Sequence, residues 1–334
     1  MLGFKGTELT PENPIVNDLR HKNLGGVILF DKLLAEKKAK NNITSPAQVK
    51  ALTRSLQQHA SSSLLIAIDQ EGGLVRRLKT EAGFPRTESP QMMGKADDPV
   101  HTAIQASCTA ATLKHLGINF NLAPSVDLNT FPDNPVIGKL GRSFSANSET
   151  LVRHAAIWIR EHKKQNILSC LKHFPGHGSS RTDSHLGFTD ISATWQEEEL
   201  TPFKLLIEQQ LADCVMPGHL FHGDLDPEYP TSLSANVINT LLRGTLGFTG
   251  LVITDDLQMK AITDKYGIEE AVCLALAAGA DMIIIGNNLK YEPLIMDRII
   301  PAVLARIDEG VIEETRIYEA LQRVKTIKQK LQME

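Results

Sequence analysis

The chain has 334 residues, and 42% of them are hydrophobic, which is enough for a large core. Its 35 basic and 39 acidic residues leave a net charge of −4, so we expect no basic surface for nucleic acid. No apolar run approaches the roughly 18 residues that cross a membrane, and the first residues show no signal peptide. These properties predict a soluble cytoplasmic protein that binds neither nucleic acid nor membranes.

Short apolar runs rich in β-branched residues recur along the chain and predict β-strands. Several are apolar on both faces, as expected of parallel strands covered by helices. A weaker first strand is expected at residues 2–4. The seven clearer strands are expected at residues 26–30, 64–69, 118–123, 168–173, 213–217, 251–254 and 282–286.

Amphipathic segments separate these runs and predict helices at residues 46–60, 99–116, 149–165, 196–209, 235–246, 268–279 and 291–309. Residues 311–334 predict a final helix packed on the outside of the domain. Strands that alternate with helices favour an α/β fold, here a single (β/α)₈ barrel of the TIM type over residues 1–334. An open doubly wound sheet is the alternative, but its Gly-x-Gly-x-x-Gly fingerprint is missing.

The four cysteines are widely spaced and lie mostly in apolar segments, at Cys108, Cys170, Cys214 and Cys273. We interpret them as buried free thiols in a reducing compartment, in agreement with a cytoplasmic location.

Ionisable residues directly follow five of the expected strands. The carboxyl ends of barrel strands meet on one face, which is where barrel enzymes place their active sites. We therefore expect these residues to gather around one site: Asp69 with Glu71, Asp127, Lys172 with His173, His219, and Asp255 with Asp256.

Residues 172–185 contain much of this chemistry, with Lys172, His173, His177, Asp183 and His185 in fourteen positions. Glycines and a proline predict a loop, and we expect residues 175–182 to form a flexible arm. The histidines and the aspartate suit either proton transfer or metal binding. The chain lacks a His-Glu-x-x-His helix pattern and a His-x-His strand pair, so we expect no metal and no cofactor.

Four blocks in the chain form a family pattern. They are Lys-His-Phe-Pro-Gly-His-Gly at 172–178 with Asp-Ser-His at 183–185, Asp-Gln-Glu-Gly-Gly at 69–73 with Arg77, Gly-Arg-Ser-Phe at 141–144, and Ile-Thr-Asp-Asp-Leu-Gln-Met at 253–259. In this order they resemble glycoside hydrolase family 3, and more narrowly its bacterial β-N-acetylglucosaminidases of peptidoglycan recycling. The resemblance runs from about residue 7 to residue 287.

The resemblance implies an exo-acting, retaining β-N-acetylhexosaminidase that works through a covalent glycosyl-enzyme intermediate. Its substrate would be terminal β-linked N-acetylglucosamine on peptidoglycan fragments (muropeptides), and we expect a monomer. The matching positions make Asp255 the nucleophile and His185 the acid and base, assisted by Asp183. A histidine suits this role because its ordinary pKa of about 6.5 lets it donate and accept a proton near neutrality.

The same matching assigns the binding of the sugar to Asp69, Arg77, Arg142, Lys172 and His173. We expect structural or supporting roles for four further polar residues at the site. Asp256 should point away from Asp255, because neighbours on a strand face opposite ways. The other three supporting residues are His177, which should bond within its loop, Asp127 and His219.

Four alternatives stay open. One is a β-glucosidase-type specificity within the same family. Another is substrate-assisted hydrolysis through an oxazoline, with Asp255 and Asp256 as helpers. A third is a metal-dependent hydrolase that uses the histidine cluster, and the last is a sugar-binding barrel without catalysis.

Overall fold

Parallel strands form the centre of the molecule. The computed structural model describes residues 1–184 and 186–331, and in this part of the chain eight strands form one sheet in sequence order. The strands are β1 (Leu2–Gly3), β2 (Gly26–Ile28), β3 (Leu65–Ile68), β6 (Phe120–Asn121), β7 (Leu168–Phe174), β8 (Cys214–Pro217), β9 (Leu251–Asp256) and β10 (Met282–Ile284).

The sheet closes on itself because β1 also meets the end of β10. Leu2 pairs with Ile285 in a parallel bridge, and the amide of Gly3 donates to the Ile285 carbonyl at 2.9 Å. A Cβ on Gly3 would lie 1.7 Å from the carbonyl oxygen of Gly286, so this close approach requires glycine. The predicted (β/α)₈ barrel is confirmed, including its weak first strand.

Apolar side chains fill both faces of the barrel wall. Along β3, Leu65 and Ala67 belong to the cluster inside the barrel, whereas Ile66 and Ile68 belong to the cluster under the helices. This alternation follows from the two-residue period of a strand. It explains why the strands are apolar on both faces in the sequence.

Two cysteines lie in the inner cluster. Cys170 on β7 and Cys214 on β8 are register partners, and their Sγ atoms are 3.4 Å apart. Both are free thiols and are fully buried. Cys273 is also free and buried, whereas Cys108 is free and exposed. The prediction of free thiols is confirmed, and burial holds for three of the four.

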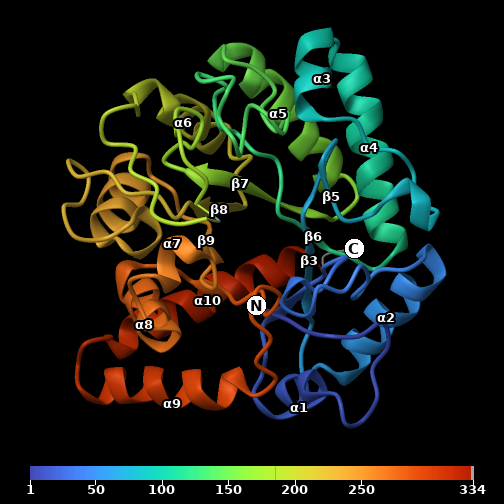
Figure 1. Cartoon of the computed structure of the whole chain (residues 1–334), viewed down its shortest axis with the longest axis vertical. Helices are drawn as coiled ribbons and strands as arrows, with labels where there is room; N and C mark the ends of the chain where they lie inside the picture. Colours follow the sequence, from blue (N-terminus) through green and yellow to red (C-terminus); the bar gives the residue numbers. More distant parts are fainter. Residues whose placement is uncertain (185, 332–334) are drawn as a thin grey trace.

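Helices surround the strands (Figure 1). Four of them begin with a capping side chain followed by proline, which has no amide hydrogen to leave unpaired and a backbone preset for the first turn. These pairs are Asn13-Pro14, Ser45-Pro46, Ser89-Pro90 and Asp98-Pro99. The helices are α1 (Pro14–His21), α2 (Pro46–His59), α3 (Pro90–Ala96), α4 (Pro99–His115), α5 (Ser148–Lys163), α6 (Thr201–Glu208), α7 (Lys260–Thr263), α8 (Ile268–Ala278), α9 (Ile295–Asp308) and α10 (Glu314–Lys330).

Shorter or wider helical turns connect some elements. A π-helix, η5 (Asn236–Thr245), takes the place of an expected α-helix. The 3₁₀ turns are η1 (Leu34–Glu36), η2 (Thr80–Ala82), η3 (Glu197–Leu200) and η4 (Thr231–Leu233). Of these, η3 leads directly into α6 and matters for the site described below.

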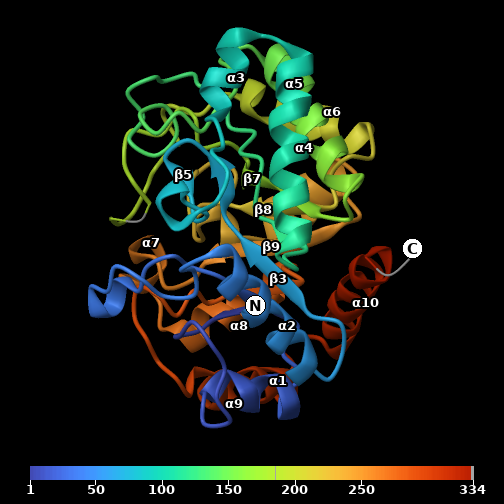
Figure 2. The same cartoon turned by 90° about the vertical axis from the view of Figure 1, so that its right-hand side faces the viewer.

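The last helix, α10, covers the amino-terminal end of the barrel, on the side away from α7 (Figure 2). Ile327 of this helix is buried with the inner cluster. Arg316 and Lys330 bond Asp281 and Asp213, which directly precede β10 and β8. The helix predicted at residues 311–334 therefore closes one end of the barrel, and the site belongs at the other.

Three helices and a hairpin were not predicted. The helices are α1, α3 and the short α7, and the hairpin consists of β4 (Gln70–Gly72) and β5 (Val75–Arg76), which pair antiparallel directly after β3. Its turn uses Gly72 and Gly73, both with positive φ, and a Cβ on Gly72 would lie 1.9 Å from the carbonyl oxygen of Glu88. The hairpin reverses the chain at the mouth of the barrel.

Candidate active site

The hairpin brings Arg77 back to the end of β3. The Nη2 atom of Arg77 donates to Oδ2 of Asp69 at 3.0 Å, and both side chains are partly exposed. Asp69 directly follows β3, so its carboxylate sits at the carboxyl end of the barrel, as predicted. The block at 69–73 with Arg77 is therefore one local structure rather than two separate signals.

Lys172 near the end of β7 joins two carboxylates from that hairpin. Its Nζ atom donates to Oδ1 of Asp69 at 2.9 Å and lies 2.7 Å from Oε1 of Glu71. Burial alone would lower the pKa of Lys172, but the charges of Asp69 and Glu71 outweigh it and raise the pKa above the ordinary value. The ammonium therefore stays charged although its side chain is 3% exposed.

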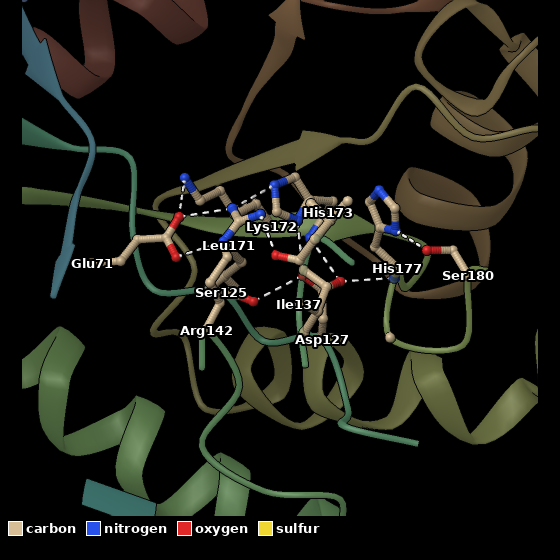
Figure 3. Close-up of polar contacts among 12 residues, drawn as sticks. Glu71, Ser125, Asp127, Ile137, Arg142, Leu171, Lys172, His173, His177 and Ser180 are labelled. Atoms are coloured by element: carbon tan, nitrogen blue, oxygen red, sulfur yellow. Dashed lines mark hydrogen bonds and ion pairs between the residues drawn. The ribbon is translucent and has the colours of Figure 1, made fainter. Parts of the chain in front are cut away.

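Arg142 forms a two-pronged ion pair with Glu71 (Figure 3). Its Nε atom donates to Oε2 at 2.9 Å, and Nη2 donates to Oε1 at 2.8 Å. The same Nη2 atom lies 3.1 Å from Nε2 of His173. Parallel hydrogen bonds of this kind fix the plane of the guanidinium as well as its position.

Asp127, in the loop after β6, binds the other side of His173. Its Oδ2 atom lies 2.7 Å from Nδ1 of His173 and accepts from the Ser125 hydroxyl at 2.8 Å. Its Oδ1 atom accepts from the amides of His173 and His177, at 3.1 and 2.8 Å. Asp127 thus orients the ring and fixes the backbone that follows β7, which is the supporting role expected from the sequence.

The charges of this network balance. Three carboxylates, Asp69, Glu71 and Asp127, lie among three cations, Arg77, Lys172 and Arg142. Burial opposes ionisation of Glu71, but Arg142 and Lys172 hold its pKa at about 2. Burial likewise opposes ionisation of Asp69 and Asp127, yet Lys172 and Arg77 hold the pKa of the first, and His173 that of the second, well below the ordinary value. Buried charges persist only with such compensation.

A cavity of about 280 Å³ opens beside this network. Asp69, Arg77, Asp255 and Asp256 line it, together with apolar side chains such as Met259. Pockets for drug-sized ligands span roughly 300 to 1,000 Å³, so this one suits a smaller molecule such as one sugar ring. Lys172, His173 and Arg142 lie behind these residues with exposed fractions of 2%, 5% and 6%, and their contact with the sugar stays a prediction.

The two aspartates that end β9 differ in their partners. Oδ1 of Asp256 accepts from the amides of Gly286 and Gln258, at 2.8 and 3.0 Å. A Cβ on Gly286 would lie 2.2 Å from Oδ2 of Asp256, so the neighbouring strand end is shaped around this carboxylate. Oδ1 of Asp255 accepts from the next amide in the chain, at 2.7 Å. The structural hydrogen bonds predicted for Asp256 are confirmed, but the prediction that only Asp255 faces the site is wrong, because both aspartates line the cavity.

His219 and His177 act as supports. His219 bonds Ser232 through Nδ1 and the Asp256 carbonyl through Nε2, at 2.7 and 3.0 Å. His177 bonds Ser180 through Nδ1 at 2.6 Å, within its own loop as predicted. Burial lowers the pKa of His177 to about 4, with a further effect from His173, so its ring is neutral near pH 7.

The end of β7 and the connection that follows it have two unlike parts. We call residues 172–180 the loop base and residues 181–184 with 186–188 the loop tip. Every residue of the loop base is buried, whereas most of the loop tip is exposed or half-buried. The prediction of a flexible arm over residues 175–182 therefore fails for residues 175–180, which are packed and hydrogen-bonded.

The loop tip contains the residues predicted to transfer protons. Asp183 is half-buried, and Ser184 is buried with its carbonyl accepting from the amide of Ala261 at 3.3 Å. Ala261 lies in α7, directly after the aspartates of β9, so the loop tip docks beside the end of that strand. His185 itself lies outside the described residues.

The described histidines of the cluster have other partners than a metal. Both ring nitrogens of His173 and both of His177 are hydrogen-bonded to protein groups. A guanidinium cation also lies 3.1 Å from Nε2 of His173, where a metal ion would need to approach. Within residues 1–184 and 186–331, no three His, Cys, Asp or Glu residues gather in a metal-binding arrangement.

Carboxylates and cations around a sugar-sized cavity, at the carboxyl end of a (β/α)₈ barrel, are the arrangement of a glycoside hydrolase. Comparison with known proteins agrees, since the model of the Glycosyl hydrolase family 3 N terminal domain matches residues 3–327. The chain belongs to glycoside hydrolase family 3, as its four blocks predicted.

Relatives of the chain share this family. A β-hexosaminidase of Tolumonas auensis is 35% identical over 303 residues, which cover 89% of this chain and 85% of the relative. The family 3 β-N-acetylglucosaminidase of Paenibacillus has a TM-score of 0.89 and 35% identity, over 99% of this chain and 61% of its own length. A β-N-acetylhexosaminidase of Beutenbergia cavernae has a TM-score of 0.86 and 26% identity, over 98% and 96%.

Two functional residues were missed by sequence reasoning. Glu71 was expected at the site beside Asp69 but was given no role, although it binds both Lys172 and Arg142. Glu199 was placed in a helix without a role, although it binds the loop base. The position of Glu71 two residues after Asp69 at a strand end was a usable signal, whereas Glu199 carried none.

Proposed function

We propose that this protein is an exo-acting, retaining β-N-acetylhexosaminidase that removes terminal β-linked N-acetylglucosamine. The names of its curated relatives and of its structural neighbours support this activity. The observation that carries the mechanism is that Asp255, at the end of β9, lines the same cavity as Asp69 and Arg77.

In the proposed mechanism, Asp255 attacks the anomeric carbon and forms a glycosyl-enzyme intermediate, which water then opens. Two displacements at one carbon restore the β configuration. Retaining enzymes generally pair the nucleophile with a second carboxylic acid. Here His185, held by Asp183, would protonate the leaving oxygen and later deprotonate the water. The hydrogen bond of Ser184 to α7 brings the neighbouring Asp183 towards the end of β9 and supports this role for it.

Asp69, Arg77, Arg142, Lys172 and His173 would bind the sugar in this proposal. Asp69 and Arg77 line the cavity and could bond ring hydroxyls directly. Lys172 would hold Asp69 in place, and the three buried residues would contact the sugar through their small exposed portions. No residue in this set requires a cofactor.

Peptidoglycan fragments are the proposed substrate, by resemblance to the enzymes of cell-wall recycling. In this proposal the enzyme is a monomer and hydrolyses these fragments in the cytoplasm. None of the described helices combines the length and the apolar character needed to cross a bilayer.

A fluorosugar that traps the intermediate tests the nucleophile. We expect a 5-fluoro N-acetylglucosaminyl fluoride to add one sugar mass to the peptide with residues 251–259, on Asp255. Replacing Asp255 with Ala should abolish both labelling and turnover. Label on another residue, or near-normal turnover by Asp255→Ala, would contradict the assignment. Failure to trap any covalent species, with activity intact, would favour the oxazoline route.

Two further candidates can be separated in one assay. A β-glucosidase would hydrolyse aryl glucoside at least as well as aryl N-acetylglucosaminide, whereas the proposed enzyme should strongly prefer the latter. A metal-dependent hydrolase would lose activity with a chelator and regain it with zinc. We expect no effect of either treatment, because the described histidines are bonded to protein groups.

A further inference from the structure

Glu199 is a buried carboxylate outside the ion network. It lies in η3, just before α6, and is 0% exposed. No described cation compensates it, and burial raises its pKa to about 7, with the charge of Asp127 adding to this effect. A buried carboxylate without a counter-ion is costly and calls for a specific reason.

Its hydrogen bonds are directed at the loop base. Oε2 of Glu199 accepts from the amides of Gly178 and Ser179, at 3.0 and 3.3 Å. Oε1 accepts from the amide of Gln196 at 3.5 Å, which closes the turn that carries Glu199 itself. One carboxylate therefore joins two segments that are about twenty residues apart in the chain.

Other contacts hold His177 and Gly178 of the loop base. The Nδ2 atom of Asn134 donates to the carbonyls of His177 and Gly178, at 2.7 and 3.0 Å. Oδ1 of Asp127 accepts from the amide of His177 at 2.8 Å. The backbone N–H groups of residues 177–179 thus all donate to carboxylates. The backbone carbonyls of residues 177 and 178 both accept from the side-chain amide of Asn134.

The glycines of the loop base allow this close packing. A Cβ on Gly176, whose φ is +128°, would lie 2.6 Å from Cβ of Glu199. A Cβ on Gly178 would lie 1.6 Å from the carbonyl oxygen of Leu128. Glycine therefore brings the backbone within reach of Glu199, rather than making the segment loose.

The loop base is linked tightly to the loop tip. Ser180 is fully buried and Ser184 is 3% exposed, with its carbonyl bonded to α7. Only residues 181–183 lie between these two fixed points, so a shift of the loop base must move Asp183.

We infer that Glu199 is a positioning residue, which holds the loop base so that the loop tip presents its proton-transfer pair at the cavity. This inference rests on the proposed roles of Asp183 and His185. Glu199 touches no cavity residue and therefore acts through the loop. A merely structural role would lower stability but would leave the dependence on the leaving group unchanged.

The test compares Glu199→Gln with Glu198→Gln, its exposed neighbour in the same turn. Two substrates are used. One is a dinitrophenyl N-acetylglucosaminide, whose dinitrophenolate leaving group departs without protonation. The other is a chitobioside, whose leaving group must be protonated. We expect Glu199→Gln to lower kcat/KM, which reports the first step, by about 10-fold or more on the chitobioside, a part of the roughly 10²- to 10⁴-fold that general acid catalysis contributes, and by less than about 3-fold on the dinitrophenyl substrate. Glu198→Gln should match the wild type on both.

Amide hydrogen exchange supplies a readout that does not need the reaction. Residues 176–184 should exchange faster in Glu199→Gln than in the wild type, while residues 251–259 should not. Equal losses of kcat/KM on both substrates, or unchanged exchange in the loop, would overturn the inference. If the wild type hydrolyses neither substrate, the proposed function fails, and the exchange result still decides whether Glu199 holds the loop base. Should Glu199→Gln fold poorly, Glu199→Asp, which keeps the carboxylate but shortens its reach to the amides of Gly178 and Ser179, gives the same comparison.

Discussion

The loop base and the loop tip belong to one connection, yet they are built in opposite ways. The base contains Lys172 and His173 and is sealed by ion pairs and by hydrogen bonds from three other segments. The tip contains Asp183 and two apolar side chains, Leu186 and Phe188, that face solvent. A group that binds the sugar must stay in place, whereas a group that donates and then accepts a proton must adjust between steps.

Breaking the loop base should have the largest effect. Lys172→Met leaves Asp69 and Glu71 buried without their shared cation, which should cost about 3–5 kcal/mol of the free energy of unfolding. Urea unfolding measures this loss, and kcat/KM should fall alike on substrates with good and poor leaving groups. Lys204→Met, at an exposed lysine of α6, is the control and should change neither quantity. A stable Lys172→Met enzyme would show that the network is not what holds the base.

Changing the loop tip should affect chemistry without affecting stability. Asp183→Asn should slow the hydrolysis of substrates with poor leaving groups by roughly 10²-fold, the lower range for general acid catalysis. Activated aryl substrates should lose much less in the first step, because their leaving groups need no proton. The midpoint of urea unfolding should stay at the wild-type value. A large loss of stability would place Asp183 with the base instead.

Acid should weaken the base through Glu71. Its pKa is about 2 in the folded protein, below the ordinary value of 4.5, so ionised Glu71 adds stability at neutral pH that is lost as the pH falls from 4.5 towards 2. The shift corresponds to about 3 kcal/mol. The wild type should therefore exceed Glu71→Gln in stability by about this amount at pH 7, and the two should converge below pH 4 in urea unfolding. Parallel curves would contradict the pairing of Glu71 with Arg142 and Lys172.

The smallest effect is expected at the surface of the tip. Leu186 is 74% exposed, so Leu186→Ser should change the free energy of unfolding by less than about 0.5 kcal/mol. Thermal unfolding measures this directly. A larger loss would mean that the tip packs more closely than its exposure indicates.

Much of the fold could be predicted because its rules are local. Apolar runs predicted the strands, and the barrel followed from their alternation with helices. The missed helices α1 and α3 are eight and seven residues long, too short for a clear hydrophobic period, although Asn13-Pro14 and Ser89-Pro90 marked their starts. The hairpin after β3 was missed because its strands have only three and two residues.

Only the site residues that lie at the ends of strands could be predicted from the sequence. Asp69, Lys172 and Asp255 follow the strand-end rule, and the structure places Asp69 and Asp255 in one cavity. The pairing of Glu71 with Arg142 joins residues 71 positions apart, and no sequence rule pairs them. The loop base was misjudged because glycine was interpreted as flexibility. At Gly178 it serves close contact with Leu128 instead.

The thiols inside the barrel make the protein its own reporter of barrel opening. Cys108 is exposed and should react with a thiol reagent at once, whereas Cys170 and Cys214 are reached only when β7 and β8 part. The slow phase of labelling would therefore time the opening of the barrel wall. Because β7 also supplies Lys172, the rate of this slow labelling phase would also report how firmly the ion network holds that strand.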